Sequence, residues 1–263
     1  MEEDILQKLA AHARERVEEK KRAEPAESVR ERALAMGGET GFPFERALRV
    51  PGLAFICECK RASPSKGLIV PDFPYVSLAR EYEAAGAAAI SVLTEPKWFL
   101  GRDEYLREIS EAIALPCLRK DFVVDEYMLY EAKTLGASAV LLICALLDGE
   151  SLQRYIEICD ELGLSALVEA HDENELKTAV RAGARVIGVN NRDLKDFSVD
   201  LDNSRRLHAL APAETVFVAE SGIRTAADVA ALRASGADAV LVGEAMVRAP
   251  DKAAKLRELR GAL

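Results

Sequence analysis

The sequence lacks both an excess of positive charge and an apolar run long enough to cross a membrane. It has 35 Lys and Arg against 44 Asp and Glu, which gives a formal net charge of −9. Nucleic acids and anionic membranes bind to cationic surfaces, so this composition argues against either as a partner. The longest uninterrupted apolar run, residues 139–147, is far shorter than a transmembrane helix.

Signals for export and for metal binding are missing as well. The N-terminal residues MEEDILQKLA are acidic and do not have the basic start and apolar core of a signal peptide. The five cysteines are an odd number and lie mostly in apolar patterns, which indicates reduced thiols in a core. Cys57 and Cys59 have no second pair and no nearby His to complete a metal site. We therefore expect a cytoplasmic protein that holds no metal.

The chain does contain a fourfold repeat in which a Gly-Ala pair precedes a short apolar run. Its glycines, Gly86, Gly136, Gly183 and Gly236, are 50, 47 and 53 residues apart. Glycine is typical of a helix C-terminus, and an apolar β-branched run is typical of a strand buried on both faces. Each interval has room for one further strand. The predicted strands are 54–60, 90–93, 117–120, 140–143, 166–169, 186–189, 216–219 and 240–242.

Eight strands that alternate with helices predict an α/β fold, the (β/α)8 TIM barrel. An open doubly wound sheet usually has fewer strands and a G-x-G-x-x-G motif, which is absent, and a solenoid has a shorter repeat. Residues 1–50 precede the repeat and predict helices, including 28–36 and 44–48. We expect residues 1–263 to form a single barrel domain, with residues 1–50 as a helical extension packed on it.

Ionisable residues recur at the C-terminal ends of the predicted strands, where TIM barrels carry their active sites. Glu58 and Lys60 share one face of the first strand, and Lys120, Glu169 and Glu220 end later strands. A structural ion pair is the alternative for Glu58 and Lys60. Because buried charges are costly, their recurrence favours a catalytic mouth. A lysine there can donate a proton and a carboxylate can accept one.

The last two strand ends predict a phosphate site. Ser221 and Gly222 follow the seventh strand and Gly243 follows the eighth, and backbone N–H groups in such turns bind phosphate. Plain turns are the alternative at these glycines. The histidines give weaker signals: we expect His12 and His208 in solvent and His171 in a loop near the mouth.

The strand-end motifs closely resemble those of the indole-3-glycerol-phosphate synthase family. The matching segments are ECKRASPSKG at 58–67, LTE at 93–95 with Trp98, Phe99 and Gly101, LRKDF at 118–122, LVE at 167–169, NNRDL at 190–194, AESGI at 219–223 and VGE at 242–244. The resemblance covers the whole chain in order, including the helical extension. Ala245 departs from the Ser that often follows this last motif in the family, which puts one hydrogen bond on the phosphate side in doubt.

The resemblance implies a carbon–carbon lyase (carboxy-lyase) of tryptophan biosynthesis. Its reaction is the ring closure of 1-(2-carboxyphenylamino)-1-deoxyribulose 5-phosphate to indole-3-glycerol phosphate, with loss of carbon dioxide and water. No cofactor is implied, because the protonated carbonyl of the substrate is itself the electrophile. The implied partner is a small anionic substrate with a carboxylate and a phosphate. Weak contacts with neighbouring tryptophan-pathway enzymes are a further expectation.

The resemblance also implies roles for individual residues. The implied catalytic residues are Lys120 as general acid, Glu169 and Glu58 as the base pair, and Lys60 at the substrate carboxylate. The implied substrate-binding residues are Ser63, Pro64, Lys66, Phe99, Phe122, Leu141, Leu167, Asn190, Arg192, Glu220 and Val242. The implied phosphate-binding residues are Ser221, Gly222, Gly243 and Glu244. How acid and base work divides between the two lysines and between the two glutamates stays open.

Two other functions compete with this interpretation. Another phosphate-binding barrel enzyme, such as phosphoribosylanthranilate isomerase, uses one acid–base pair and not two lysines with two glutamates. A non-catalytic barrel that only binds a partner would be expected to lose part of the charged set, and the sequence has all of it.

Overall fold

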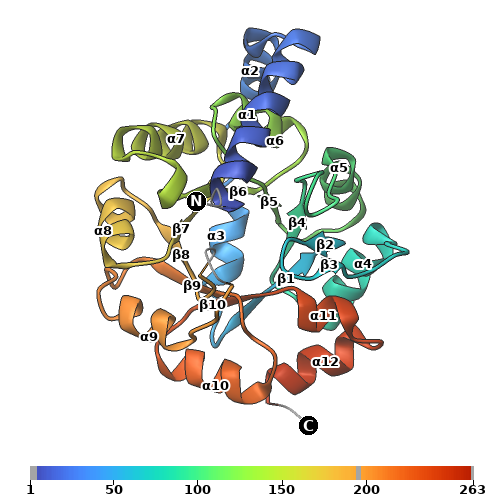
Figure 1. Cartoon of the computed structure of the whole chain (residues 1–263), viewed down its shortest axis with the longest axis vertical. Coiled ribbons are helices and arrows are strands. Elements are labelled where there is room, and N and C mark those ends of the chain that lie inside the picture. Colours follow the sequence, from blue (N-terminus) through green and yellow to red (C-terminus); the bar gives the residue numbers. More distant parts are fainter. Residues whose placement is uncertain (1–4, 194–196, 262–263) are drawn as a thin grey trace.

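The computed structural model describes residues 5–193 and 197–261, and its centre is a closed barrel of eight parallel strands (Figure 1). Neighbouring strands follow the order β1-β10-β9-β8-β7-β6-β5-β4, after which β4 pairs with β1. The strands are β1 (Ala54–Cys59), β4 (Ala89–Leu93), β5 (Cys117–Lys120), β6 (Ala139–Ile143), β7 (Ser165–Ala170), β8 (Val186–Asn190), β9 (Val216–Glu220) and β10 (Ala239–Val242). The predicted TIM barrel is confirmed.

Helices surround the barrel and connect its strands (Figure 1). They are α4 (Tyr75–Ala85), α5 (Asp103–Ala112), α6 (Tyr127–Thr134), α7 (Gly149–Leu162), α8 (Glu173–Arg181), α9 (Asp202–His208), α10 (Ala226–Ala234), α11 (Glu244–Arg248) and α12 (Lys252–Leu259), with a 3-10 turn η1 (Cys144–Leu146). The four repeat glycines have φ values of 84° to 95°, in the left-handed region that favours glycine. The repeat thus marks the turns that lead from a helix into the next strand.

Three helices precede the first strand: α1 (Ile5–Ala23), α2 (Ala26–Ala35) and α3 (Pro43–Leu48). The buried face of α1 includes Leu6, Leu9 and Ala13, which pack with residues at the carboxyl ends of the strands. Phe44 and Leu48 of α3 are fully buried against the opposite end of the barrel interior. No helix in the described ranges is long and apolar enough to cross a membrane.

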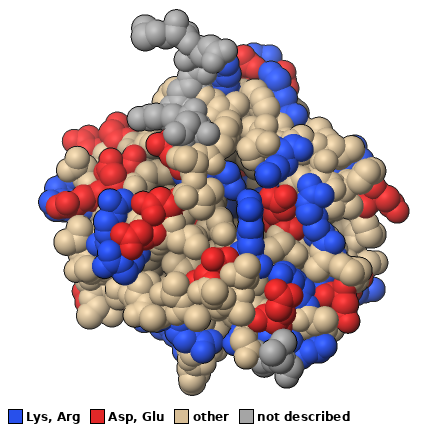
Figure 2. All heavy atoms as spheres, turned by 60° about the horizontal axis from the view of Figure 1, so that its bottom comes forward, with Lys and Arg blue, Asp and Glu red and all other residues tan. Residues whose placement is uncertain are grey.

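Side chains that alternate along each strand face two different hydrophobic cores, one inside the barrel and one between the barrel and the helices. Ile56 and Leu118 pack inside the barrel, whereas Cys57 and Cys59 pack against the helices. This alternation turns Glu58 toward the barrel axis, as the sequence predicts. All five cysteines are buried and free. Outside the barrel, Lys and Arg atoms are interspersed with Asp and Glu atoms on the face that Figure 2 presents.

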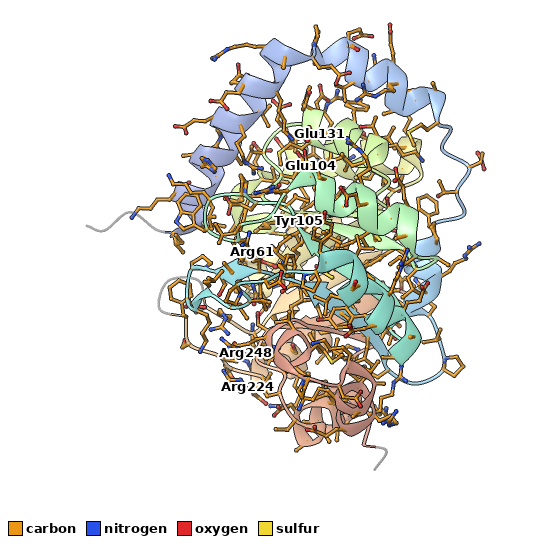
Figure 3. The ribbon with its side chains drawn as sticks, turned by 90° about the vertical axis from the view of Figure 1, so that its right-hand side faces the viewer. Arg61, Glu104, Tyr105, Glu131, Arg224 and Arg248 are labelled. Carbon is orange, nitrogen blue, oxygen red and sulfur yellow. The ribbon has the colours of Figure 1, made fainter. Side chains whose placement is uncertain are left out.

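A buried charge network on the helix-facing side of β5 docks α1 onto the barrel. The Arg119 side chain is fully buried, and its Nη2 lies 2.9 Å from Asp103 Oδ1 and 2.7 Å from Glu131 Oε2. Lys20 of α1 pairs with the same two carboxylates, and Glu131 lies on the side that faces α1 and α2 (Figure 3). These ion pairs hold the N-terminal extension against the strand that ends at Lys120.

Arg16 of α1 adds a bidentate pair to this network. Its Nη2 lies 2.7 Å from Asp121 Oδ1, and its Nη1 donates to Asp121 Oδ2 at 3.2 Å. Thr94 Oγ1 also donates to Asp121, at 2.6 Å. Burial raises the pKa of Asp121, but Arg16, Arg119 and the Thr94 hydrogen bond together outweigh burial and lower this pKa to about 2. Because Asp121 directly follows Lys120, the network fixes the end of β5.

Candidate active site

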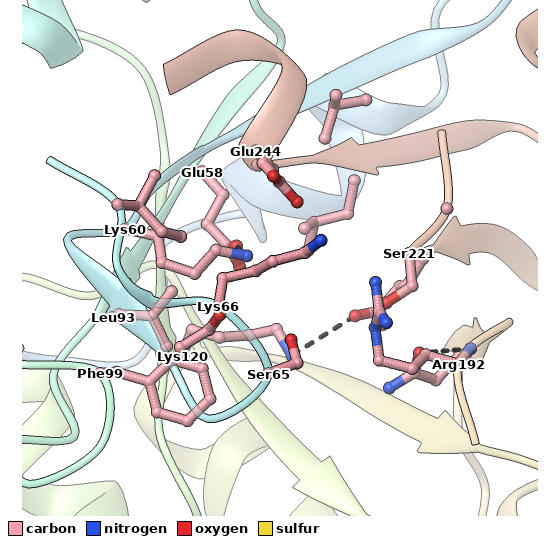
Figure 4. Close-up of a pocket in the computed structure, with 18 of the residues that line it drawn as sticks. Glu58, Lys60, Ser65, Lys66, Leu93, Phe99, Lys120, Arg192, Ser221 and Glu244 are labelled. Carbon is pink, nitrogen blue, oxygen red and sulfur yellow. Dashed lines mark hydrogen bonds and ion pairs between the residues drawn. The ribbon is translucent and has the colours of Figure 1, made fainter. Parts of the chain in front are cut away.

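A pocket of about 720 Å³ opens at the carboxyl ends of the barrel strands (Figure 4). Strand ends form most of its wall, and the hairpin of β2 (Ala62–Ser63) and β3 (Gly67–Leu68) adds one edge. The predicted site residues that line it are Glu58, Lys60, Ser63, Pro64, Lys66, Phe99, Lys120, Phe122, Leu141, Glu169, Asn190, Arg192, Glu220, Ser221, Gly222, Val242, Gly243 and Glu244.

Leu167 is the predicted site residue that the structure does not bring to the pocket. It points into the barrel like Glu169 but precedes it by two positions, which places it about 7 Å deeper along β7. Its side chain is fully buried in the interior core and does not line the pocket. The expectation that Leu167 binds the substrate stays a prediction, and this position below the pocket does not support it.

Lys120 lies between two buried carboxylates. Its Nζ is 3.4 Å from Glu169 Oε2 and 3.4 Å from Glu220 Oε2. Burial alone lowers the pKa of Lys120, but Glu220 and Glu169 outweigh it and raise that pKa. The ammonium group is therefore protonated throughout the neutral range.

The two carboxylates beside Lys120 differ from each other. Burial raises the pKa of Glu220 to about 7, with Lys120 opposing that rise and Glu169 adding to it. For Glu169, burial is opposed by Lys120, by His171 and by a hydrogen bond from Asn190, which together outweigh it and lower the pKa. At neutral pH Glu169 is thus ionised, while Glu220 takes up a proton readily.

A second lysine–glutamate pair lies at the end of β1. Lys60 Nζ is 2.7 Å from Glu58 Oε1, and Ser91 Oγ donates to Glu58 Oε2 at 3.4 Å. The Glu58 side chain is 5% exposed and that of Lys60 is 18% exposed, so the ammonium group is the part that meets the pocket. Both pairs belong to one cavity, which therefore offers two cations and several carboxylates to a substrate.

Aromatic and apolar side chains form one end of the pocket. Phe99 and Phe122 have ring centroids 6.0 Å apart, and Leu93 lies beside Phe99 (Figure 4). The loop that carries Phe99 is held by the buried Glu95 carboxylate, which accepts from the N–H groups of residues 97, 98 and 99 at 2.9, 2.7 and 3.0 Å. Ile5 and Leu9 of α1 also line this cavity. The sequence predicts an apolar face on this helix, but it does not show that this face packs at the pocket.

Backbone turns and cations form the other end. Ser221 (φ 68°) and Gly222 (φ 80°) follow β9 in the left-handed region, which is uncommon for Ser and marks a constrained turn. Gly243 precedes α11, and Ser221 and Arg192 lie together away from Phe99 (Figure 4). The Arg192 N–H donates to Asn190 Oδ1 at 3.0 Å. Leu194, which ends the NNRDL motif, lies outside the described residues.

Three basic residues that the sequence did not single out also line the pocket: Arg224, Arg248 and Lys255. Arg224 and Arg248 lie at the same edge of the molecule (Figure 3). Burial and, after it, the Arg224 charge lower the pKa of Arg192. These cations give the pocket a local positive charge despite the net charge of −9. They occur in helix-like contexts that, in the sequence, resemble ordinary surface positions.

The histidines differ from the sequence expectation. His12 lies 3.3 Å from Glu95 and edge-on to Trp98, and His208 packs edge-on against Phe217. Both are half-buried, so the prediction that they are in solvent is wrong: their partners come from segments distant in sequence. His171 follows β7, as expected, but it also pairs with Glu169 at 3.4 Å. Within the described ranges, no group of three or more His, Cys, Asp and Glu residues is placed to hold a metal ion.

Comparison with solved structures agrees with the fold. The chain is similar to 3-hexulose-6-phosphate synthase from Salmonella typhimurium, with a TM-score of 0.66, 17% identity, and 80% of this chain and 98% of that chain covered. Thiamine phosphate pyrophosphorylase from Pyrococcus furiosus gives a TM-score of 0.60 at 19% identity, over 80% of this chain and 94% of that chain. At such identities the likeness concerns the barrel fold alone.

Sequence comparison is far more specific. The family model described as "Indole-3-glycerol phosphate synthase" matches residues 6–259. An indole-3-glycerol phosphate synthase of Ruminiclostridium cellulolyticum is 55% identical over 98% of this chain and 99% of its own length. The enzyme of the same name from Lachnoclostridium phytofermentans is 46% identical over 98% of this chain and 100% of its own length. The chain therefore belongs to the indole-3-glycerol phosphate synthase family.

Proposed function

We propose that the pocket closes the indole ring of 1-(2-carboxyphenylamino)-1-deoxyribulose 5-phosphate by general acid–base catalysis. Family membership makes the chain a carboxy-lyase of tryptophan biosynthesis. The observation that carries the assignment to this pocket is the position of Lys120. Its protonated ammonium lies between Glu169 and Glu220, in a cavity that also holds the Lys60–Glu58 pair.

The two ends of the pocket match the two ends of this substrate. The aromatic ring fits the Phe99 and Phe122 end, and the phosphate fits the turns at Ser221–Gly222 and Gly243–Glu244. Backbone N–H groups in such turns are good ligands for phosphate oxygens. Asn190 and Arg192 then orient the sugar-derived chain between them. This orientation places the substrate carbonyl near the middle of the cavity, where the lysines are.

Lys120 acts as the general acid in this proposal. Its raised pKa keeps a proton on the ammonium, which donates to the carbonyl oxygen as the ring carbon forms the new carbon–carbon bond. Carbon dioxide then leaves, and the electron pair of the broken bond restores the aromatic ring. Lys60 faces the carboxylate that is lost and holds it in place through its charge.

Dehydration needs a base and an acid. Glu169 is the ionised carboxylate beside Lys120, so we assign it the removal of the carbon-bound proton, with Glu58 as the second carboxylate of the base pair. The departing hydroxyl group takes a proton from a lysine ammonium and leaves as water. Each of these steps uses groups that line the same cavity, so no bound cofactor enters the proposal.

The proposed partners follow from charge. A substrate with a carboxylate and a phosphate needs local cations, and the pocket supplies Lys60, Lys66, Arg192, Arg224 and Lys255. The net charge of −9 supports neither nucleic acid nor membrane as a partner. A cytoplasmic location and weak contacts with neighbouring tryptophan-pathway enzymes complete the proposal.

Fluorescence of the indole product tests this function on the purified chain. We expect indole-3-glycerol phosphate to form from the carboxylated, phosphorylated substrate and carbon dioxide to be released in equal amount. Isomerisation of phosphoribosylanthranilate without ring closure would instead support the second barrel-enzyme interpretation. Substrate binding without turnover would support the non-catalytic one. Either of these results contradicts the proposed function.

A further inference from the structure

The two carboxylates that flank Lys120 have pKa values shifted in opposite directions, although their contacts with Lys120 are alike. Their Oε2 atoms are both 3.4 Å from Lys120 Nζ, and their side chains are 2% and 3% exposed for Glu169 and Glu220. Neither their distance to the lysine nor their burial therefore selects one of them as the ionised base. Their other neighbours differ: the His171 cation and a hydrogen bond from Asn190 lower the pKa of Glu169 against burial, whereas burial and the Glu58 charge raise that of Glu220.

We infer that His171 is a positioning residue whose positive charge fixes Glu169, and not Glu220, as the ionised carboxylate of the site. This inference rests on the proposed function, in which Glu169 is the base. His171 does not line the pocket, so it acts through Glu169 and not on the substrate.

Hydrogen bonds fix the direction in which the His171 ring points. Its Nδ1 lies 3.0 Å from Glu175 Oε2, and the same oxygen accepts from the His171 backbone N–H at 2.8 Å. Nε2 is then turned toward β7 and lies 3.4 Å from Glu169 Oε1. This buried nitrogen has no hydrogen-bond partner among the described residues, and the Glu169 carboxylate is the ion-pair partner that it faces.

The charges around His171 favour its protonated form. Glu175 on α8 and Glu169 on β7 face the ring, and Glu220 on β9 adds a weaker attraction. Burial opposes these carboxylates, which nevertheless raise the pKa of His171 to about 9. Asp172, the next residue, accepts from the Glu175 N–H at 2.9 Å.

Two other elements contact this region through uncharged groups. From α9, Asn203 Nδ2 donates to the His171 carbonyl oxygen at 3.1 Å. From η1, Cys144 Sγ contacts the Glu175 carbonyl oxygen at 3.6 Å. Glu169 thus has two cations, Lys120 and His171, at 3.4 Å, whereas Glu220 has Lys120 at that distance and an Oε1 atom without a hydrogen bond to another described residue. The excess proton of this cluster therefore goes to Glu220.

The pH profile of His171→Gln tests this role, with His208→Gln as the matched control because His208 packs on Phe217 at β9 and does not line the pocket. An opposite charge at this distance typically lowers a carboxyl pKa by about 1–3 units. We expect the acid limb of kcat/KM to move upward by at least about one pH unit in His171→Gln. Activity below that limb falls about tenfold or more, and activity near pH 9 stays close to that of the wild type. An equal loss at every pH, or an unchanged profile, overturns the inference.

Imidazole NMR gives a second test that needs no turnover. In long-range 1H–15N spectra of the wild type, we expect one histidine to remain an imidazolium through pH 8, and its signal to be absent from His171→Gln. In Glu169→Gln the pKa of that histidine should fall. Titration of His171 near its ordinary pKa of about 6.5 contradicts the inference. Failure of the ring-closure assay would refute the proposed function instead, and the NMR result would remain interpretable by itself.

Discussion

Gly243 lies directly against the Glu58 carboxylate, and a Cβ atom on this glycine would be 2.5 Å from Glu58 Oε1. The same atom would be 2.9 Å from Lys60 Nζ. The turn after the last strand therefore shares its space with the charged pair of the first strand. The phosphate side of the pocket and its charged pair are thus coupled by packing, because a Cβ atom at Gly243 would require the ends of Glu58 and Lys60 to shift.

Gly243→Ala should consequently affect turnover as well as substrate binding. The added methyl group displaces Glu58 and Lys60, and misplacement of reacting groups by about 1 Å can cost about 10²-fold in rate. We expect a loss in kcat of that order together with a raised KM, both measured by indole fluorescence. Gly149→Ala is the control, because its Cβ would be 3.9 Å from Thr178 Cγ2, an ordinary contact. A raised KM with unchanged kcat would show that the two sides are independent.

Gly222 tests the phosphate side more selectively. It has φ +80°, and a Cβ there would be 2.3 Å from Val199 Cγ1, away from the lysine–glutamate pairs. Gly222→Val should raise KM strongly with a smaller change in kcat. An analogue without phosphate should bind the variant and the wild type alike. Gly183→Ala controls for backbone strain, since Gly183 has φ +86° and open space around it. Full retention of phosphate discrimination by Gly222→Val would mean that the phosphate binds elsewhere.

Lys60→Met separates a functional pair from a structural one. Both side chains line the open pocket, so water can take the place of the ammonium group beside Glu58 although the carboxylate is largely buried. We expect kcat/KM to collapse while the free energy of unfolding changes little, measured by kinetics and denaturant melts on one preparation. The variant should also bind a carboxylated product analogue more weakly than the wild type does, with a smaller loss of affinity for the decarboxylated counterpart. A loss of several kcal/mol with wild-type kcat/KM in the folded fraction would make Lys60 a structural residue.

Asp121→Asn tests the dock between α1 and β5. The substitution leaves Arg16 with a buried, uncompensated charge, which typically costs roughly 3–5 kcal/mol. Because the pKa of Asp121 is lowered to about 2, its stabilisation is complete above about pH 4 and is lost as pH falls toward 2. Denaturant melts should thus show a shallower acid dependence for the variant than for the wild type. Asp202→Asn, at a half-exposed pair with Arg205, should change little. Equal effects of the two substitutions contradict the role of the dock.

The barrel could be predicted from the sequence because its signals are local. A Gly-Ala turn lies directly before four of the strands, and short apolar runs mark the other four, so the predicted strands agree with the observed ones to within a residue or two at their ends. The β2–β3 hairpin could not be predicted in this way. Its strands have two residues each, too few to show any alternation.

The charged contacts depend on segments far apart in the chain, which a single sequence does not reveal. In the sequence, Arg119 is simply a second basic residue next to Lys120. In the structure, the alternation of side chains along β5 turns Arg119 toward the helices, where it pairs with Asp103 and Glu131. For His171 the sequence does contain a signal, because it lies two residues after Glu169 and four before Glu175. That spacing puts a histidine within reach of both carboxylates once a strand end and the first turn of a helix meet.

The most direct test of the whole account is the kcat of Lys120→Ala, with chemistry shown to be rate-limiting. A positioned acid contributes about 10²–10⁴-fold, so we expect a loss of that size with a smaller change in KM, and a comparable loss in Glu169→Gln. Lys97→Ala, an exposed lysine outside the pocket, should retain wild-type activity. A folded Lys120→Ala variant with near-normal kcat would contradict the assignment of Lys120 as the general acid.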